Sequence, residues 1–228
     1  MLTVESVSVS MGDRRIIDDV SFSVEKGTLI ALLGPNGAGK TTVLRTLAGI
    51  LTPTIGTIAW DGNSMASMGR DWYRLIGYSP DRSPVVPEMT VLEYLHFIAE
   101  IKGAPSQENG VKDLIDAMSL SEVQTTRCGL LSHGFRQRVS VAQAFLSNAD
   151  IILLDEPTQG LDPEQVVRLR HYLASAISDR VIVVSSHHIS ELAQVASRYI
   201  IMGGGKIQSM GDVTAKLEAD YLTVVGRR

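Results

Sequence analysis

Residues 28–41 read TLIALLGPNGAGKT, an apolar run that leads directly into a glycine-rich turn ending in Lys40 and Thr41. The last eight of these residues match the phosphate-binding loop pattern in full. The glycines let backbone N–H groups turn inward around phosphate oxygens, while Lys40 adds a positive charge and the Thr41 hydroxyl can bind Mg²⁺. Glycine-rich turns between a strand and a helix are common, but this spacing after a buried strand favours a nucleotide site. We expect the nucleotide to contact Asn36, Gly37, Ala38, Gly39, Lys40, Thr41 and Thr42.

Two further apolar runs have the same character: IILL at 151–154 and VIVV at 181–184. None of the three runs alternates with polar residues, which is typical of strands covered on both faces in a parallel sheet. A helix is predicted to follow Asp162, because Asp162, Pro163 and Glu164 supply an N-cap, a first-turn proline and a first-turn acid. The pattern therefore predicts a doubly wound α/β fold, preceded by an N-terminal strand in which apolar and polar residues alternate.

A segment of different character lies between the first and second runs. TVLE at 90–93 makes a capping box, and an apolar stripe at helical spacing follows it, formed by Val91, Tyr94, Leu95 and Ile98. The stretches KDLIDAMSL and RQRVSVAQAFL continue the helical pattern. We predict a helical subdomain over 81–149, inserted in an α/β core made of 1–80 and 150–228.

Polar residues follow the second and third runs at the points where these strands end. Asp155 and Glu156 follow the second run, and His187 follows the third. Ligands of open α/β sheets lie beyond the carboxyl ends of the strands, so we expect Asp155 to hold Mg²⁺ and Glu156 to orient or activate a water molecule. His187 could contact a γ-phosphate or that water. Alternatively, the two acids only cap the next helix and the histidine is structural; the phosphate loop at the same edge favours the site.

Composition restricts the class of protein. The formal net charge of −4 over 228 residues offers no broad positive surface for nucleic acid, so we expect no nucleic-acid partner. The single cysteine, Cys128, excludes an internal disulfide. No apolar run approaches the roughly 18 to 20 residues that span a bilayer. If a membrane is involved, we expect another chain to cross it.

Taken in order, these motifs resemble those of the nucleotide-binding subunit of ABC transporters, and the resemblance covers nearly the whole chain. GPNGAGKT is similar to Walker A, IILLDE to Walker B, LSHGF at 131–135 to the signature and QGLDP to the D-loop. The resemblance implies a P-loop NTPase core with a mainly parallel sheet, an N-terminal antiparallel β portion and an inserted helical subdomain. It also implies ATP and Mg²⁺ as ligands, and catalytic roles for Lys40, Glu156 and His187.

In that family the signature of one subunit completes the ATP site of a second, so that two ATP molecules lie between head-to-tail protomers. The resemblance thus implies that Ser132, Gly134 and Asp162 contact ATP held by a partner. Ser132 and Gly134 stand at the predicted start of a helix, whose amides and dipole can point at a γ-phosphate. Alone, the Leu-Ser-x-Gly pattern could be a mere helix cap. The implied partners are a second copy or a homologous ATPase subunit, and a separate permease at the cytoplasmic face of the cell membrane.

Within the family, PEMTVLEYLHFIAEIKG and FRQRVSVAQAFL are similar to the ABC-2 branch, whose members usually power exporters. Two residues depart from the family pattern. Asp81 stands in the Q-loop, IGYSPD, where most relatives have Gln, and Met11 takes the place of the aromatic residue that usually stacks on adenine. Met11 offers a base less contact area and no ring. Asp81 is either a third metal ligand or a turn residue that caps the segment ahead.

Two other functions fit the motifs less well. A soluble ABC ATPase acting on nucleic acid or the ribosome is disfavoured because the chain has one short cassette, no heptads and no basic tract. A regulatory ATP sensor that does not hydrolyse is disfavoured by the presence of Glu156.

Overall fold

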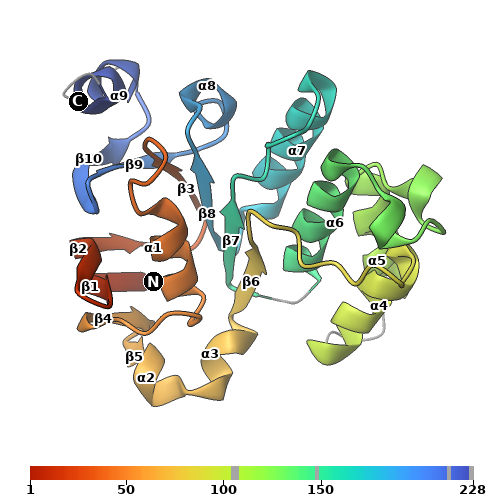
Figure 1. The fold of residues 1–228 in the computed structure, drawn as a ribbon, viewed down its shortest axis with the longest axis horizontal. Coiled ribbons are helices and arrows are strands. Elements are labelled where there is room, and N and C mark those ends of the chain that lie inside the picture. The colour runs from red at the N-terminus through yellow and green to blue at the C-terminus, as the bar shows by residue number, and fades with distance from the viewer. Residues whose placement is uncertain (104–107, 147–148, 215–216, 226–228) are drawn as a thin grey trace.

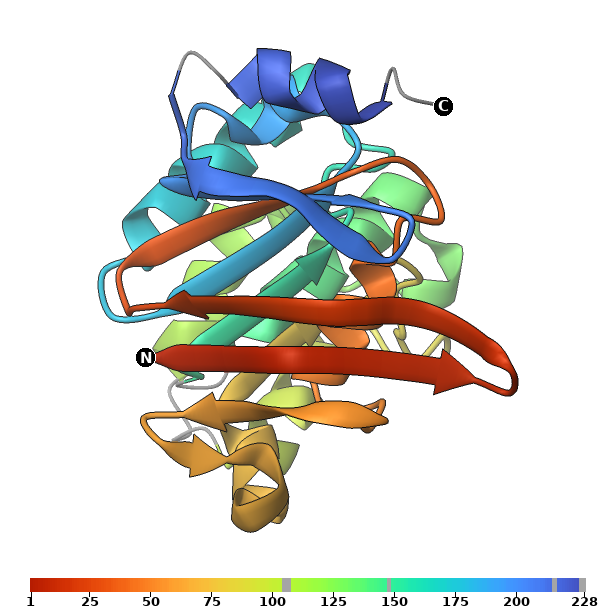
Figure 2. The same cartoon turned by 90° about the vertical axis from the view of Figure 1, so that its left-hand side faces the viewer.

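Two β-sheets form the body of the molecule (Figure 1). The computed structural model describes residues 1–103, 108–146, 149–214 and 217–225. A four-stranded antiparallel sheet has the order β2-β1-β4-β5, and its strands are β1 (Leu2–Met11), β2 (Arg14–Val24), β4 (Ile55–Trp60) and β5 (Asn63–Ser64). Figure 2 shows β1 and β2 running side by side along the near face. The expected N-terminal antiparallel portion is confirmed.

The second sheet is six-stranded, in the order β10-β9-β3-β8-β7-β6. Its strands are β3 (Thr28–Leu33), β6 (Ile76–Ser79), β7 (Ile151–Asp155), β8 (Val181–Ser186), β9 (Arg198–Gly203) and β10 (Lys206–Asp212). All neighbours pair in parallel except β10, which runs antiparallel to β9. The three apolar runs are thus confirmed as parallel strands. Strand β3 lies between β8 and β9, whereas β2 and β4, which precede and follow it in the chain, belong to the other sheet.

The burial of β3 and β7 explains why their sequences do not alternate. Leu29, Ala31 and Leu33 of β3 pack with the helices on one face of the sheet, whereas Ile30 and Leu32 pack with the antiparallel sheet and α1 on the other. In β7, Ile152 and Leu154 face the helices, and Ile151 and Leu153 face the antiparallel sheet. Both faces are covered, so every position is apolar.

The described helices are α1 (Lys40–Leu47), α2 (Met65–Met68), α3 (Arg70–Arg74), α4 (Val91–Ile101), α5 (Glu108–Ala117), α6 (His133–Phe145), α7 (Pro163–Ala176), α8 (Ile189–Leu192) and α9 (Leu217–Val225). Side-chain caps mark the starts of α2, α4, α6 and α7. The capping box is confirmed at Thr90, whose side chain accepts from the Glu93 N–H while Glu93 accepts from the Thr90 N–H. Asp162 caps α7, as predicted. In the described part of the chain, no helix combines the length and the apolar character needed to cross a bilayer.

The helices α4, α5 and α6 follow β6 in the chain and precede β7, and they lie together beyond β6 in Figure 1. The division of the chain at 81 and 149 stays a prediction. Of the predicted subdomain, 104–107 and 147–148 lie outside the described residues. The C-terminal stretch, to which the sequence assigned no structure, contains α9.

Candidate nucleotide-binding site

The phosphate loop joins β3 to α1 and requires glycine at two points where other residues do not fit. Gly34 has φ +148°, and a Cβ there would collide with the Met202 carbonyl oxygen. Gly39, the N-cap of α1, has φ +103°, and a Cβ there would lie 2.8 Å from Ile17 Cγ2. These close approaches hold the loop against β9 and β2. Lys40, Thr41 and Thr42 at the start of α1 line the hollow beside the loop, where the first N–H groups of the helix can donate to an anion.

The Lys40 side chain is held in place by contacts within the protein itself. Its side chain is only 6% exposed. Its Nζ donates to the Gly34 carbonyl oxygen at 2.7 Å and lies 3.3 Å from Glu156 Oε1. A side chain with many rotamers is thus fixed with its charge at the opening of the loop. Less side-chain conformational entropy is therefore lost when a phosphate binds.

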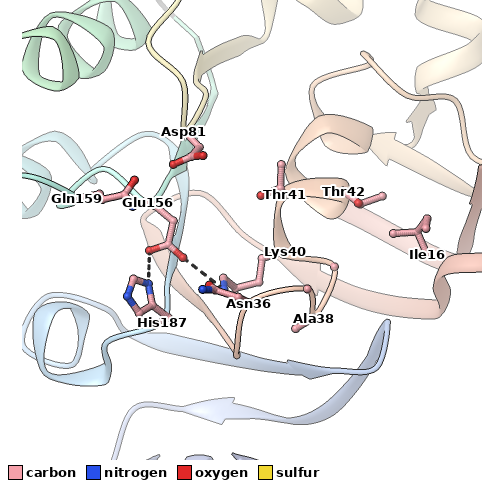
Figure 3. Close-up of a pocket in the computed structure, with 12 residues that line it drawn as sticks. Ile16, Asn36, Ala38, Lys40, Thr41, Thr42, Asp81, Glu156, Gln159 and His187 are labelled. Atoms are coloured by element: carbon pink, nitrogen blue, oxygen red, sulfur yellow. Dashed lines mark hydrogen bonds and ion pairs between the residues drawn. The ribbon is translucent and has the colours of Figure 1, made fainter. Parts of the chain in front are cut away.

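Glu156 lies between Lys40 and His187 (Figure 3). Its Oε2 is 2.9 Å from His187 Nδ1, so one carboxylate links the phosphate loop to the residue that follows β8. The backbone of Glu156 has φ +48°, which is uncommon for a residue other than glycine. The Glu156 N–H donates to Ser185 Oγ at 2.9 Å, and Gln137 Nε2 donates to the Glu156 carbonyl at 3.3 Å. These two bonds hold the strained backbone and so fix the direction of the carboxylate.

Asp155 lies beneath the site and is fully buried. Its Oδ1 accepts from Ser185 Oγ at 2.6 Å, but its Oδ2 has no hydrogen-bond partner among the residues that the structure describes. Burial raises the pKa of Asp155, the hydroxyl groups of Ser185 and Thr41 lower it, and the negative charges of Asp81 and Glu156 raise it further. A divalent cation would satisfy the free oxygen and compensate the buried charge. Asp155 and Asp81, with Thr41 of the phosphate loop, therefore have the oxygen ligands that fit Mg²⁺.

An open hollow of about 460 Å³ lies above these groups. The predicted residues that line it are Asn36, Gly37, Ala38, Gly39, Lys40, Thr41, Thr42, Asp81, Glu156 and His187. Ile16 and Gln159 also line it, and sequence reasoning missed both. No motif marks Ile16, which reaches the rim because β2 lies beside the phosphate loop. Gln159 had a signal in the sequence, because it is the first residue of the QGLDP motif and stands three residues after Glu156.

The other predicted ligands do not line this hollow. Met11 is 46% exposed at the end of β1, in the hairpin that leads to β2. Ser132 caps α6, its Oγ accepting from the Phe135 N–H at 3.4 Å, and Asp162 caps α7, accepting from the Gln165 N–H at 2.9 Å. Gly134 packs so closely that a Cβ would lie 2.8 Å from the Gly160 carbonyl oxygen. The structure thus brings the signature and Gly160 of the D-loop together, whereas Ser132, Gly134 and Asp162 do not line the hollow at the phosphate loop of their own chain.

The side chains of His133 and Phe135 in LSHGF pack within the chain. A Cβ on Gly160 would collide with the His133 ring, so this D-loop glycine leaves the space that His133 occupies. Phe135 lies under the Arg138 guanidinium, whose central carbon is 4.2 Å from the ring centroid. Both side chains are therefore accommodated by neighbours in the same chain.

The sequence comparison with known families gives a direct assignment. Residues 17–159 match the sequence model of the family described as ABC transporter. The chain belongs to the ABC transporter family. It is an ATP-binding subunit of that family and an ATPase.

The alignments of this ABC ATPase with two curated relatives cover most of each relative's length. It is 32% identical over 221 residues to Nod factor export ATP-binding protein I of Burkholderia lata, covering 94% of this chain and 72% of the relative. It is 34% identical over 217 residues to lipopolysaccharide export system ATP-binding protein LptB of Haemophilus influenzae, covering 92% and 90%. It spans only 23% of the longer ABC transporter A family member 1 of Dictyostelium discoideum, at 34% identity and with 89% of this chain aligned.

Solved structures show the same fold. The structure of an ATP-binding subunit of an ABC transporter superposes with a TM-score of 0.88 at 24% identity, covering 99% of both chains. The α/β cassette with an antiparallel N-terminal sheet and a mainly parallel second sheet is therefore confirmed.

Proposed function

We propose that this ABC ATPase hydrolyses ATP in a head-to-tail dimer and drives a separate transmembrane permease from the cytoplasmic face of the membrane. The observation that carries the proposal is the division of the predicted ligands: Glu156 and His187 line the hollow, whereas Ser132 and Asp162 are exposed elsewhere on the chain. A second copy, or a homologous subunit, turned head to tail would bring its Ser132 and Gly134 to the open side of the hollow. The amides at the start of its α6 would then face the γ-phosphate.

In this proposal each residue of the hollow has one task. The α1 N-terminus and Lys40 bind the β- and γ-phosphates. A γ-phosphate gives Lys40 a new anionic partner, so that Glu156 Oε1 is released to accept a hydrogen bond from the attacking water. His187 holds the other oxygen of Glu156 and contacts the γ-phosphate, and the partner's signature excludes bulk water.

Thr41, Asp155 and Asp81 would hold Mg²⁺. The unpartnered, buried Oδ2 of Asp155 supports this assignment. The metal, when bound, supplies positive charge against the phosphate oxygens. Asp81 is one of the two departures from the family pattern, and it adds a charge where the family usually has a neutral amide. Adenine would lie near Met11 at the hairpin tip, and the Met11 side chain offers no aromatic ring to stack on it.

We infer that the transporter is an exporter of the ABC-2 branch. The names of two relatives, one exporting Nod factor and one acting in lipopolysaccharide export, support this direction. The similarity of 87–103 to that branch supports it independently of those names.

The test of the proposed function is Glu156→Gln. The amide keeps the shape of the side chain but loses the basic carboxylate, so ATP binding is expected to persist while the hydrolysis rate falls by at least about a hundredfold. ATP with Mg²⁺ should then trap a dimer, visible by light scattering. Glu25→Gln, an exposed acid in the turn between β2 and β3, is the matched control and should hydrolyse ATP as the unaltered protein does. Unaltered hydrolysis in Glu156→Gln would disprove the assignment.

A further inference from the structure

The C-terminal helix α9 contacts the segment that carries His187. Leu217 anchors the start of α9 and is 2% exposed, and the Tyr199 hydroxyl on β9 donates to Asp220 Oδ2 at 2.6 Å. On the same helix, the Tyr221 hydroxyl donates to the backbone carbonyl oxygen of His187 at 2.9 Å. In Figure 2, α9 lies above β10, on the same side of the molecule as α8.

His187 follows β8 and precedes α8, so its backbone lies outside the hydrogen-bonded ladder of the sheet. Side chains replace the ladder there. The carbonyl of His187 accepts from Tyr221, and the N–H of His188 donates to Ser186 Oγ at 2.9 Å. These two groups belong to one planar peptide unit. Holding both of its ends fixes the plane, and with it the direction from which the imidazole of His187 reaches Glu156.

We propose that Tyr221 is a positioning residue for ATP hydrolysis, which holds the His187 carbonyl and thereby keeps the imidazole against Glu156. The inference rests on the proposed function, because it assumes that His187 acts in hydrolysis. A continuous set of contacts then runs from α9 through His187 and Glu156 to Lys40. Burial raises the pKa of Tyr221, and the negative charge of Glu156 acts in the same direction. The hydroxyl therefore stays protonated, as a donor must.

A purely structural role for Tyr221 would be to fasten α9 to the body. Tyr199 already does this without touching His187, since its hydroxyl reaches Asp220 of α9 and Ser209 of β10. The two tyrosines therefore form a matched pair. Removing either hydroxyl removes one hydrogen bond to or from α9, but only Tyr221→Phe frees the His187 peptide.

The first measurement is steady-state ATP hydrolysis. Tyr221→Phe is expected to lower kcat about fivefold, the loss typical of one hydrogen bond, while KM for ATP stays within about twofold because the phosphate loop is untouched. Tyr199→Phe is expected to leave kcat unchanged. Equal losses in both variants would overturn the inference, since fastening of α9 would then explain them.

The second measurement separates this inference from the proposed function. His187→Ala should itself reduce kcat; if it does not, the proposed role of His187 is wrong. If it does, adding Tyr221→Phe should cause no further loss, because the residue through which Tyr221 acts is gone. A fivefold further loss would overturn the positioning role alone.

A third measurement does not depend on activity. The NMR signals of the His187 imidazole, identified by their loss in His187→Ala, should shift in Tyr221→Phe and stay in place in Tyr199→Phe. Unmoved imidazole signals in Tyr221→Phe would overturn the inference even if kcat falls.

Discussion

At the scale of single residues, Asp81 brings a negative charge to the rim of a site that already contains Asp155 and Glu156. All three carboxylates are close enough for the charges of Asp81 and Glu156 to raise the pKa of Asp155. Without a cation, this charge opposes the binding of a triphosphate; in the proposed site it becomes a ligand once a cation is bound. The affinity for ATP should therefore depend on Mg²⁺ more strongly than in a relative with Gln at this position.

Asp81→Gln tests this expectation. The substitution removes one negative charge, so ATP should bind about fivefold more tightly in EDTA, the equivalent of roughly 1 kcal/mol. In saturating Mg²⁺ the affinity should change less than twofold. Titrations of a fluorescent ATP analogue, followed under both conditions, would measure the difference. Asp71→Asn on α3, an exposed acid paired with Arg74, is the control. The same ratio of affinities in Asp81→Gln and the unaltered protein would place Asp81 in a turn, away from the metal.

The residues that sequence could predict are those whose task is set locally. Lys40 and Thr41 follow from the loop that precedes them, and Glu156 follows from its place at the end of β7. Gln137 and Tyr221 could not be predicted, because each meets the site through packing with a segment distant in the chain. Gln137 reaches the Glu156 carbonyl from α6, and Tyr221 reaches His187 from α9.

At the scale of elements, α6 lies directly on β6. A Cβ on Gly77 of β6 would collide with the Ala144 carbonyl of α6, so glycine alone permits this approach. The buried hydroxyls of Ser79 and Ser140 are 2.8 Å apart and join the same two elements. The helix that carries Ser132 is therefore fixed to the strand that leads to Asp81.

Gly77→Ala should consequently lower the free energy of unfolding by about 3 kcal/mol, because helix and strand must separate to admit the methyl group. Denaturant titration followed by circular dichroism would measure the loss. Gly211→Ala is the matched control: this strand glycine on β10 has its nearest neighbour at 3.4 Å, an ordinary contact, and should change stability by less than about 1 kcal/mol. Equal stability of the two variants would show that α6 can move away from β6 at little cost.

Among the helices too, those set by local contacts could be predicted from the sequence, and those set by distant contacts could not. The starts of α4 and α7 were predicted because Thr90 and Asp162 cap them through contacts three residues apart. The helix α9 was not predicted, because its buried face, with Leu217, Tyr221 and Val224, is defined by surfaces that come from elsewhere in the chain. Sheet order could not be derived from residue patterns alone, since β3 pairs with strands far along the sequence.

At the scale of the whole molecule, a head-to-tail arrangement predicts that defective subunits can complement each other. Ser132→Arg should bind ATP as a monomer but hydrolyse it at least tenfold more slowly, since the new side chain intrudes on the phosphate held by its partner. Lys40→Ala should fail at the phosphate loop instead. A mixed dimer contains one site built from the intact halves of each variant.

An equal mixture of the two variants should therefore regain about a quarter of the normal hydrolysis rate, because half of the dimers are mixed and each contains one good site of two. Each variant alone is the control, measured at the same total concentration. A mixture no more active than the mean of its components would mean that Ser132 does not act across the dimer.

The central position of β3 in its sheet also has a consequence for the synthesis and folding of the chain. Thr28 pairs with Val181 on one side, and Ile30 pairs with Arg198 on the other. The strand that presents the phosphate loop thus has no sheet neighbour until the last third of the polypeptide has been synthesised. Contacts so distant in sequence form late in folding. An interrupted translation product carrying all of GPNGAGKT should accordingly have no useful affinity for ATP, so that unfinished chains do not compete with complete ones for nucleotide.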